Sequence, residues 1–146
     1  MNLNESMKKY QYYHPIEVRY ADIDAQRHVN SKCYFTYMEQ ARVKFIQALE
    51  LWSGIEFDAL GMILAEQSCR YIHPITYGQH IRVGVRTSRV GTKSFELTYS
   101  IQDAQTEKEM AVGRTVLVTY DYTQGKSIPI PDTWRKAISQ SVIPKT

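Results

Sequence analysis

The chain has 146 residues, of which 43% are hydrophobic and 23% charged, a composition typical of a single globular domain. Its formal net charge of +3 is too small to indicate a nucleic-acid-binding surface, but it is compatible with an anionic ligand such as a phosphorylated cofactor. No segment has the ~20 apolar residues that cross a bilayer, the apolar core of a signal peptide is missing, and two cysteines are too few for a disulfide framework. We therefore expect a cytoplasmic protein.

The first elements along the chain are predicted to be a strand and a long helix. Apolar and polar or small residues alternate over residues 16–21, which is the pattern of a strand with one buried face. After a polar stretch, apolar residues recur at steps of three and four over residues 34–52, which predicts one amphipathic helix. Asn30 or Ser31 can cap the N-terminus of this helix, and Gly54 can end it.

The second half of the chain is predicted to be mostly strands. A short helical turn over residues 55–60 precedes four runs rich in β-branched and aromatic residues, at 62–72, 81–90, 95–101 and 110–122. Polar turns separate the last three of these runs at 91–93 and 103–109. Asp132 can cap a short C-terminal helix.

This order of elements predicts a single α+β domain over residues 1–146, in which an antiparallel sheet of about five strands wraps the long helix. One helix cannot cover both faces of such a sheet, and one edge strand stays open. We therefore expect a homo-oligomer, at least a homodimer and alternatively a homotetramer.

The densest cluster of reactive side chains is RYADIDAQRHVNSKCY, which lies between the first strand and the long helix. Asp24 lies in this loop, and the free amides of the first helical turn near Ser31 point back toward it. Such amides can polarise a carbonyl while the carboxylate attacks it or activates a water, which suits acyl transfer. Taken singly, however, Asp22, Asp24 and Asn30 are more typical of turn and capping residues.

The stretch RYADIDAQRHVN followed by SKCYFTYMEQAR resembles the start of the hotdog-fold acyl-CoA thioesterases of the 4-hydroxybenzoyl-CoA thioesterase type. The segments YIHPITYG at 71–78 and GTKS at 91–94 extend the resemblance over most of the chain. The resemblance implies a hotdog fold and a thioesterase that releases a carboxylic acid and a free thiol without a metal or redox cofactor. It also implies that Asp24 is the catalytic carboxylate, and that the helix-start amide near Ser31 polarises the thioester carbonyl.

The loop is also similar to that of the plant acyl-carrier-protein thioesterases, whose motif has an aspartate, an asparagine and a histidine at the positions of Asp24, Gln26 and His28. This sequence has glutamine in place of that asparagine. Many acyl-CoA members have glycine at the position of Arg27 and asparagine at that of Ser31. The resemblance makes Asp24 and His28 the expected catalytic residues. The expected substrate-binding residues are Gln26, Asn30, Ser31 and Tyr34.

Other groups are candidates for the same chemistry. Cys33 lies in the first helical turn, where a thiolate nucleophile is favoured, but a small packed residue is the simpler interpretation. A triad of Ser31, His28 and Asp24 is improbable, because such groups normally converge from separate elements. Glu39 and Glu66 are alternative carboxylates.

The sequence leaves the ligand and its partners open. The four histidines show no spacing typical of a metal site. Arg86, Arg89 and Lys93 flank a turn and are candidate ligands of the coenzyme A phosphates. Besides an acyl-CoA thioesterase, an acyl-carrier-protein thioesterase and a non-catalytic acyl-CoA sensor remain alternatives.

Overall fold

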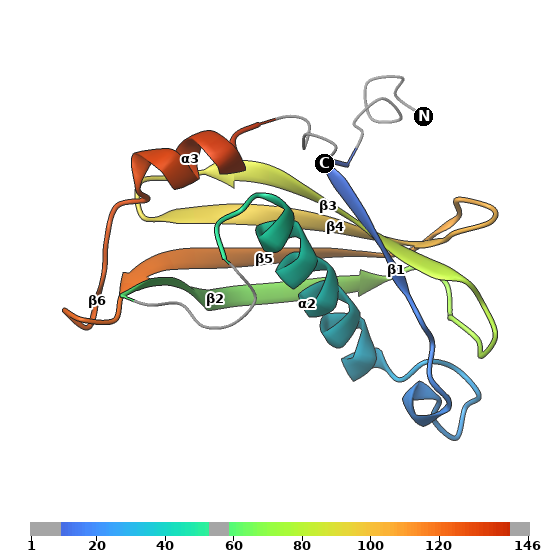
Figure 1. Cartoon of the computed structure of the whole chain (residues 1–146). Helices are drawn as coiled ribbons and strands as arrows, with labels where there is room; N and C mark the ends of the chain where they lie inside the picture. The colour runs from blue at the N-terminus through green and yellow to red at the C-terminus, as the bar shows by residue number, and fades with distance from the viewer. Residues whose placement is uncertain (1–9, 53–58, 141–146) are drawn as a thin grey trace.

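The computed structural model describes residues 10–52 and 59–140, which form a long helix laid across a curved sheet and a short helix near the C-terminus (Figure 1). In chain order the elements are β1 (Tyr12–Ile16), the 3-10 turn η1 (Tyr20–Asp22), α2 (Ser31–Ala48), β2 (Leu60–Tyr71), β3 (Ile81–Val90), β4 (Ser94–Asp103), β5 (Glu109–Asp121), β6 (Lys126–Ser127) and α3 (Asp132–Ile138). The sheet has the order β1-β3-β4-β5-β2, with β6 paired to β5, and all neighbouring strands are antiparallel. The predicted α+β architecture is confirmed.

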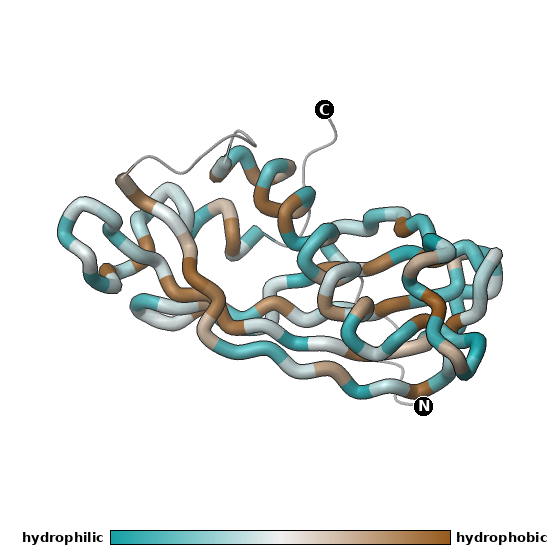
Figure 2. The backbone as a smooth tube through the Cα atoms, turned by 90° about the horizontal axis from the view of Figure 1, so that it is seen from below, coloured by the Kyte–Doolittle hydropathy of each residue, from teal (hydrophilic) through white to brown (hydrophobic). Residues whose placement is uncertain are grey.

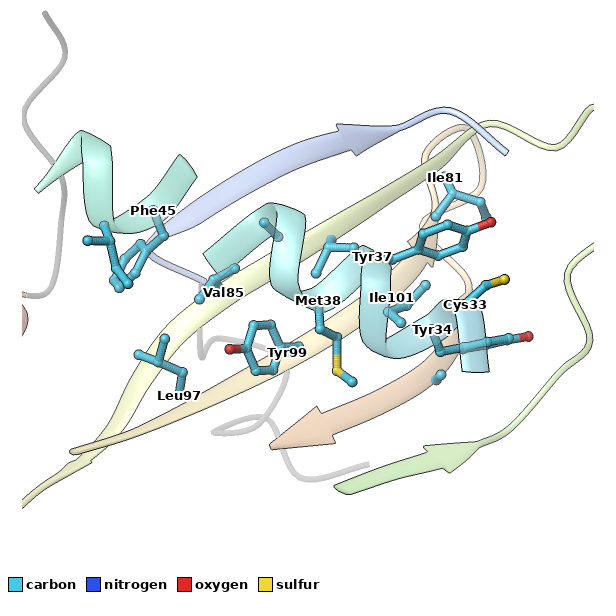
Figure 3. Close-up of a cluster of buried hydrophobic side chains, with 14 of the residues drawn as sticks. Cys33, Tyr34, Tyr37, Met38, Phe45, Ile81, Val85, Leu97, Tyr99 and Ile101 are labelled. Carbon is cyan, nitrogen blue, oxygen red and sulfur yellow. The ribbon is translucent and has the colours of Figure 1, made fainter. Parts of the chain in front are cut away.

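The core lies between α2 and the sheet face that it covers. Along β3 and β4 buried apolar residues recur at every second position, as expected for strands with one face toward the helix. Figure 2 shows hydrophobic and hydrophilic residues interspersed along the strands of the sheet. Helix residues at steps of three and four meet these strands, because those positions share one side of an α-helix (Figure 3). The large, fully buried side chains of this layer include Met38, Phe45, Ile81, Phe95, Leu97, Tyr99 and Ile101.

A glycine lets the helix approach β5 closely. A Cβ atom at Gly113 would overlap the sulfur of Met38 and would contact the carbonyl oxygen of Ser68 at 3.4 Å. The thioether of Met38 therefore fills the space above the glycine and packs against the backbone of β5.

The opposite face of the sheet is polar. Tyr10 and Tyr13 lie over Gly84, and the guanidinium of Arg82 is 4.3 Å from the ring centre of Tyr13. Several polar groups of this face pair with one another: Arg114 with Glu96, Arg82 with Gln102, and Ser100 with both Gln102 and Glu109. Aromatic rings and ion pairs thus finish the face that a single helix leaves uncovered.

Two predicted boundaries at the start of the chain were wrong. The first strand is Tyr12–Ile16, not 16–21, and Tyr20 lies in η1 with 81% of its surface exposed. Buried and exposed positions alternate in β1 and apolar and polar residues alternate over 16–21, but only the earlier segment pairs with β3. Pro15 is tolerated there because β1 is an edge strand. The helix ends at Ala48, before Trp52, with Glu50 in the left-handed conformation at φ 60°. The predicted terminator, Gly54, lies outside the described residues.

The remaining boundaries agree closely with the prediction. β3 covers the predicted residues 81–90, and β2, β4 and β5 differ from their predictions by one or two residues at each end. Most of the short helical turn predicted at 55–60 falls outside the described residues, and Leu60 already belongs to β2. Asp132 is the first residue of α3 and not its cap, because Pro131 occupies the cap position without a side-chain bond.

One sheet edge is long and open. β2 is the last strand of the sheet path, and its residues 63–68 are all exposed. Leu64 lies opposite Leu117 of β5 and keeps 38% of its surface exposed, whereas Leu117 is buried. None of the helices in the described part of the chain is long and apolar enough to span a membrane.

Candidate active site

The loop between η1 and α2 closes on itself. Ile23 and Val29 form an isolated antiparallel bridge, and the amide of Asp24 donates to the carbonyl oxygen of His28 at 3.0 Å. Within this loop the amide of Arg27 donates to the carbonyl oxygen of Asp24 at 2.9 Å, and Arg27 itself adopts a left-handed φ of 67°. This conformation explains why glycine suits the position in the resembling family, since glycine adopts it without steric cost.

The carboxylate of Asp24 is held from both sides. Its Oδ1 accepts from the amide of Gln26 at 2.9 Å, and its Oδ2 accepts from the side-chain amide of Asn30 at 3.4 Å. The first bond is an Asx turn, so Asp24 does shape its own loop. The second bond is long and leaves this partly exposed carboxylate free to accept further hydrogen bonds.

The first turn of α2 leaves one amide uncommitted. Asn30 is the cap, as predicted: its Oδ1 accepts from the amide of Lys32 at 3.1 Å. Its carbonyl oxygen accepts from the amide of Cys33 at 2.9 Å. The amide of Ser31 donates to no acceptor in residues 10–52 or 59–140. A free amide at the positive end of a helix dipole can stabilise an oxyanion.

A pocket of about 380 Å³ brings most of the predicted residues together. Its lining residues are Asp24, Gln26, His28, Val29, Ser31, Tyr34, Tyr71, Ile72, His73 and Pro74. Asn30 does not line the pocket but reaches it through its bond to Asp24. The loop and the helix start thus share one pocket with the end of β2.

Tyr71 and His73 belong to this wall but were not predicted as site residues. The ring of Tyr71 packs edge-to-face on Tyr34 with 4.7 Å between centroids. Burial is the main cause of the raised pKa of Tyr34, so its hydroxyl stays protonated. The signal was in the segment YIHPITYG, but the contact is long-range. The amide of Val29 donates to the carbonyl oxygen of Ile75 at 2.8 Å and joins the same two segments.

The predicted coenzyme A ligands lie far from this pocket within the chain. The loop that lines the pocket follows β1, whose last residue, Ile16, pairs with Ile81 at the start of β3. Arg86 and Arg89 lie in the second half of β3, and Lys93 lies in the turn after it. A strand of ten residues is roughly 33 Å long. Contact between these cations and a ligand at Asp24 stays a prediction.

The alternative nucleophiles and carboxylates do not line the pocket. The side chains of Glu39 and Glu66 are each 66% exposed and lie within 4 Å of Arg42 and Arg114, respectively. Cys33 is buried, and burial together with the nearby Asp22 raises the pKa of its thiol, which agrees with a packed residue.

No hydrogen bond joins the side chains of Ser31, His28 and Asp24 in the part of the chain that the structure describes. That part also holds no group of three or more His, Cys, Asp or Glu residues arranged to hold a metal ion.

Comparisons with known proteins agree with this arrangement. A model of the thioesterase-like superfamily matches residues 18–138. YsmA, an uncharacterised protein of Bacillus subtilis (strain 168), is 25% identical over 138 residues, which cover 94% of this chain and 92% of that protein.

Many solved structures share the architecture, among them two thioesterases. A thioesterase from Thermus thermophilus, crystallised with coenzyme A and zinc, is 28% identical with a TM-score of 0.77, and the match covers 90% of this chain and 95% of that one. Slr0204 from Synechocystis, a 1,4-dihydroxy-2-naphthoyl-CoA thioesterase, has a TM-score of 0.78 over 87% of this chain and 94% of its own; its 20% identity supports the shared fold alone. With its helix, sheet and loop in this order, the chain belongs to the thioesterase-like superfamily and has the hotdog fold.

Proposed function

We propose that the protein is a thioesterase that hydrolyses acyl-CoA thioesters to a carboxylic acid and free coenzyme A. One observation carries this proposal: Asp24, with its partly exposed carboxylate, and Ser31, with its uncommitted amide, line the same pocket. A thioester carbonyl between them would meet a nucleophile or base on one side and an oxyanion donor on the other.

The reaction needs only the chain's own groups and water. Asp24 either attacks the carbonyl carbon, giving an anhydride that water then hydrolyses, or removes a proton from a water that attacks. In both routes the carbonyl oxygen gains negative charge near the Ser31 amide, the carbon–sulfur bond breaks, and the thiolate leaves and takes up a proton. His28 lies in the same pocket and orients or polarises the carbonyl.

The acyl-CoA substrate is supported by family membership and by the Thermus thermophilus thioesterase, which was crystallised with coenzyme A. The pocket also has tyrosine rings from Tyr34 and Tyr71 beside its polar groups, which fits an acyl group next to a polar thioester. Gln26 contributes its backbone amide to Asp24, so its side chain is free to contact the substrate.

The active assembly in this proposal is a homodimer formed along β2. An exposed twelve-residue edge strand with Ile63 and Leu64 uncovered is a template for pairing with a second copy. Antiparallel pairing would bring the far end of one sheet to the pocket side of the other. In that arrangement Arg86, Arg89 and Lys93 of one protomer could reach the phosphates of a ligand bound at its partner.

Thiol release from a panel of acyl-CoA substrates tests the activity. Wild type is compared at several pH values with Asp24→Asn and with Asp132→Asn, the same change on α3, away from the pocket. We expect turnover to fall by about 10²-fold or more in Asp24→Asn only, the range for loss of a nucleophile or base. Full activity in that variant would redirect attention to Glu39 or Glu66.

The wild-type protein separates the alternatives. If the wild type binds acyl-CoA but releases no thiol, the thioesterase proposal fails and a non-catalytic acyl-CoA sensor is favoured. If the wild type hydrolyses acyl-carrier-protein thioesters but no acyl-CoA, the substrate is acyl-carrier protein and not acyl-CoA.

The molar mass of the protein, measured by light scattering during size-exclusion chromatography, tests whether it is a dimer. Leu64→Lys should give monomers, whereas Tyr77→Lys, which also replaces an exposed apolar residue but away from β2, should not. A wild-type monomer at all concentrations would exclude this assembly.

A further inference from the structure

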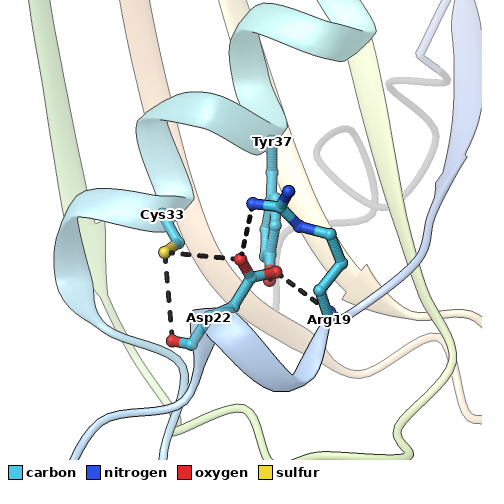
Figure 4. Close-up of polar contacts among 4 residues, drawn as sticks. All are labelled: Arg19, Asp22, Cys33 and Tyr37. Carbon is cyan, nitrogen blue, oxygen red and sulfur yellow. Dashed lines mark hydrogen bonds and ion pairs between the residues drawn. The ribbon is translucent and has the colours of Figure 1, made fainter.

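A buried aspartate lies at the start of the active-site loop, two residues before Asp24. Asp22 is 2% exposed, and its carboxylate contacts four groups (Figure 4). These are the Arg19 amide at 3.0 Å, the Arg19 guanidinium at 3.0 Å, the Tyr37 hydroxyl at 2.8 Å and the Cys33 thiol at 3.9 Å. Such a set of donors satisfies a buried carboxylate on both oxygens.

The side chain of Asp22 is a charged acceptor. Burial by itself would raise the pKa of this carboxyl, but the bonds from the Arg19 amide, the Tyr37 hydroxyl and the Arg19 guanidinium outweigh it, and the pKa lies below its ordinary value of 3.8. The Arg19 side chain is 67% exposed, so solvent screens that ion pair. Tyr37 is buried, so solvent cannot replace the bond from its hydroxyl.

The backbone of Asp22 is bonded to the other end of the loop. Its carbonyl oxygen accepts from the amide of Asn30 at 2.8 Å and lies 3.9 Å from the thiol of Cys33. Asn30 in turn holds Asp24 and caps α2. The backbone of Asp22, at the start of the loop, is therefore bonded to Asn30 at the end of the loop. The side chain of Asp22 is bonded to Tyr37 in the second turn of α2.

We propose that Asp22 is a positioning residue, which fixes the Asp24 loop against α2 through the Tyr37 hydroxyl and the Asn30 amide. This inference rests on the proposed function for its catalytic consequence. The placement of a reacting carboxylate relative to its oxyanion donor controls turnover, since a misplacement of ~1 Å can cost ~10²-fold in rate. The loop itself can be tested without activity.

The test compares two buried tyrosines that differ in what they hold. Tyr37→Phe removes the hydroxyl that reaches Asp22. Tyr99→Phe removes a buried hydroxyl that bonds Thr115 at 2.7 Å and Arg42 at 3.3 Å, in the core and away from the loop. Each variant loses one buried, hydrogen-bonded tyrosine hydroxyl and keeps the aromatic ring, so a general loss of stability affects both.

Two readouts are taken on the full chain. For acyl-CoA hydrolysis we expect kcat to fall by about tenfold in Tyr37→Phe with KM changed less than about threefold, and Tyr99→Phe to stay within about twofold of wild type. Hydrogen exchange followed by NMR should show faster exchange of the Asn30 and Asp24 amides in Tyr37→Phe only. Equal effects of the two variants on both kcat and exchange would overturn the proposal.

If the wild type hydrolyses no thioester, the proposed function fails and the exchange readout alone decides the positioning role. Faster loop exchange confined to Tyr37→Phe would support it, and unchanged loop exchange would end it. Asp22→Asn adds a second check, because asparagine keeps the size of the side chain but loses its charge. We expect its loop exchange to exceed that of wild type.

Discussion

The hydroxyl of Tyr71 donates a hydrogen bond to the carbonyl oxygen of Ser31 at 2.9 Å, across 40 residues of sequence. The bond ties the end of β2 to the first turn of α2, where the free amide of Ser31 lies. Ser31 is thus held at its carbonyl from the strand side, and the preceding peptide, which carries its amide, is held where the carbonyl oxygen of Asn30 accepts from the amide of Cys33. The donor proposed for the oxyanion is therefore fixed by two elements.

Removal of this bond should weaken catalysis modestly. We expect Tyr71→Phe to lower kcat/KM by about threefold to tenfold, because one partly exposed hydrogen bond contributes about 1 kcal/mol. Steady-state kinetics with the best acyl-CoA substrate measures this, with Tyr77→Phe, an exposed tyrosine outside the pocket, as control. Identical kinetics for the two variants would show that Tyr71 does not hold the site.

The left-handed conformation of Arg27 predicts a gain in stability on substitution by glycine. Arg27 has φ 67° and is exposed, so its side chain contributes little packing while its Cβ is strained. Arg27→Gly should raise the free energy of unfolding by up to about 1 kcal/mol, the cost of a left-handed residue with a Cβ. Urea denaturation measures it, and Arg27→Ala, which keeps the Cβ, should show no such gain.

The close approach of α2 to β5 predicts that Gly113→Ala destabilises the protein. The added Cβ would overlap the Met38 sulfur, so we expect a loss of about 1–3 kcal/mol, typical of an overfilled core. In a Met38→Ala background the same change should cost much less, because the overlapping atoms are gone. Additive losses in thermal or urea denaturation would place the strain elsewhere.

The hydrogen bonds to Asp103 predict that part of the free energy of unfolding depends on pH in the acid range. Amides of Thr106 and Gln105 and the side chain of Gln79 donate to this carboxylate, and they lower its pKa from 3.8 to about 2. A carboxyl with a lowered folded-state pKa stabilises the protein above its unfolded pKa, and this contribution is lost as the pH falls toward 2.

Asp103→Asn should therefore be less stable than wild type at neutral pH. The difference in melting temperature should shrink as the pH falls from about 4 to about 2, where the wild-type carboxyl becomes neutral as well. A difference that stays constant over this range would mean that the charge of Asp103 does not contribute.

Local patterns predicted most of the fold. The 3.6-residue repeat predicts α2, and Asn30 is predictable as a cap because capping is a contact between near neighbours. The prediction misplaced the first strand because the alternation runs on through Val18 and Tyr20, and only pairing with β3 decides which half is the strand. The early end of α2 at Ala48 is hard to predict because glutamate rarely adopts the left-handed conformation that Glu50 has.

The candidate site could be predicted only on the side formed by contiguous sequence. Asp24, Gln26, His28 and Ser31 come from one loop and the helix that follows, so resemblance found them together. Tyr71 and His73 arrive from the end of β2 through a backbone bond between segments 46 residues apart, which no local pattern encodes. The two functions of Asp24, turn former and pocket carboxylate, coexist because its two oxygens have different partners.

The bridge between Ile23 and Val29 fixes the two ends of the loop, so the residues between them can vary without changing how the loop is anchored. Ala25, Gln26 and Arg27 are exposed between its fixed ends, and the bond from Gln26 to Asp24 uses only the backbone. Side chains at these three positions can therefore change while the carboxylate keeps its place. In the proposed thioesterase, substrate preference could therefore be altered at these three positions without moving the carboxylate of Asp24.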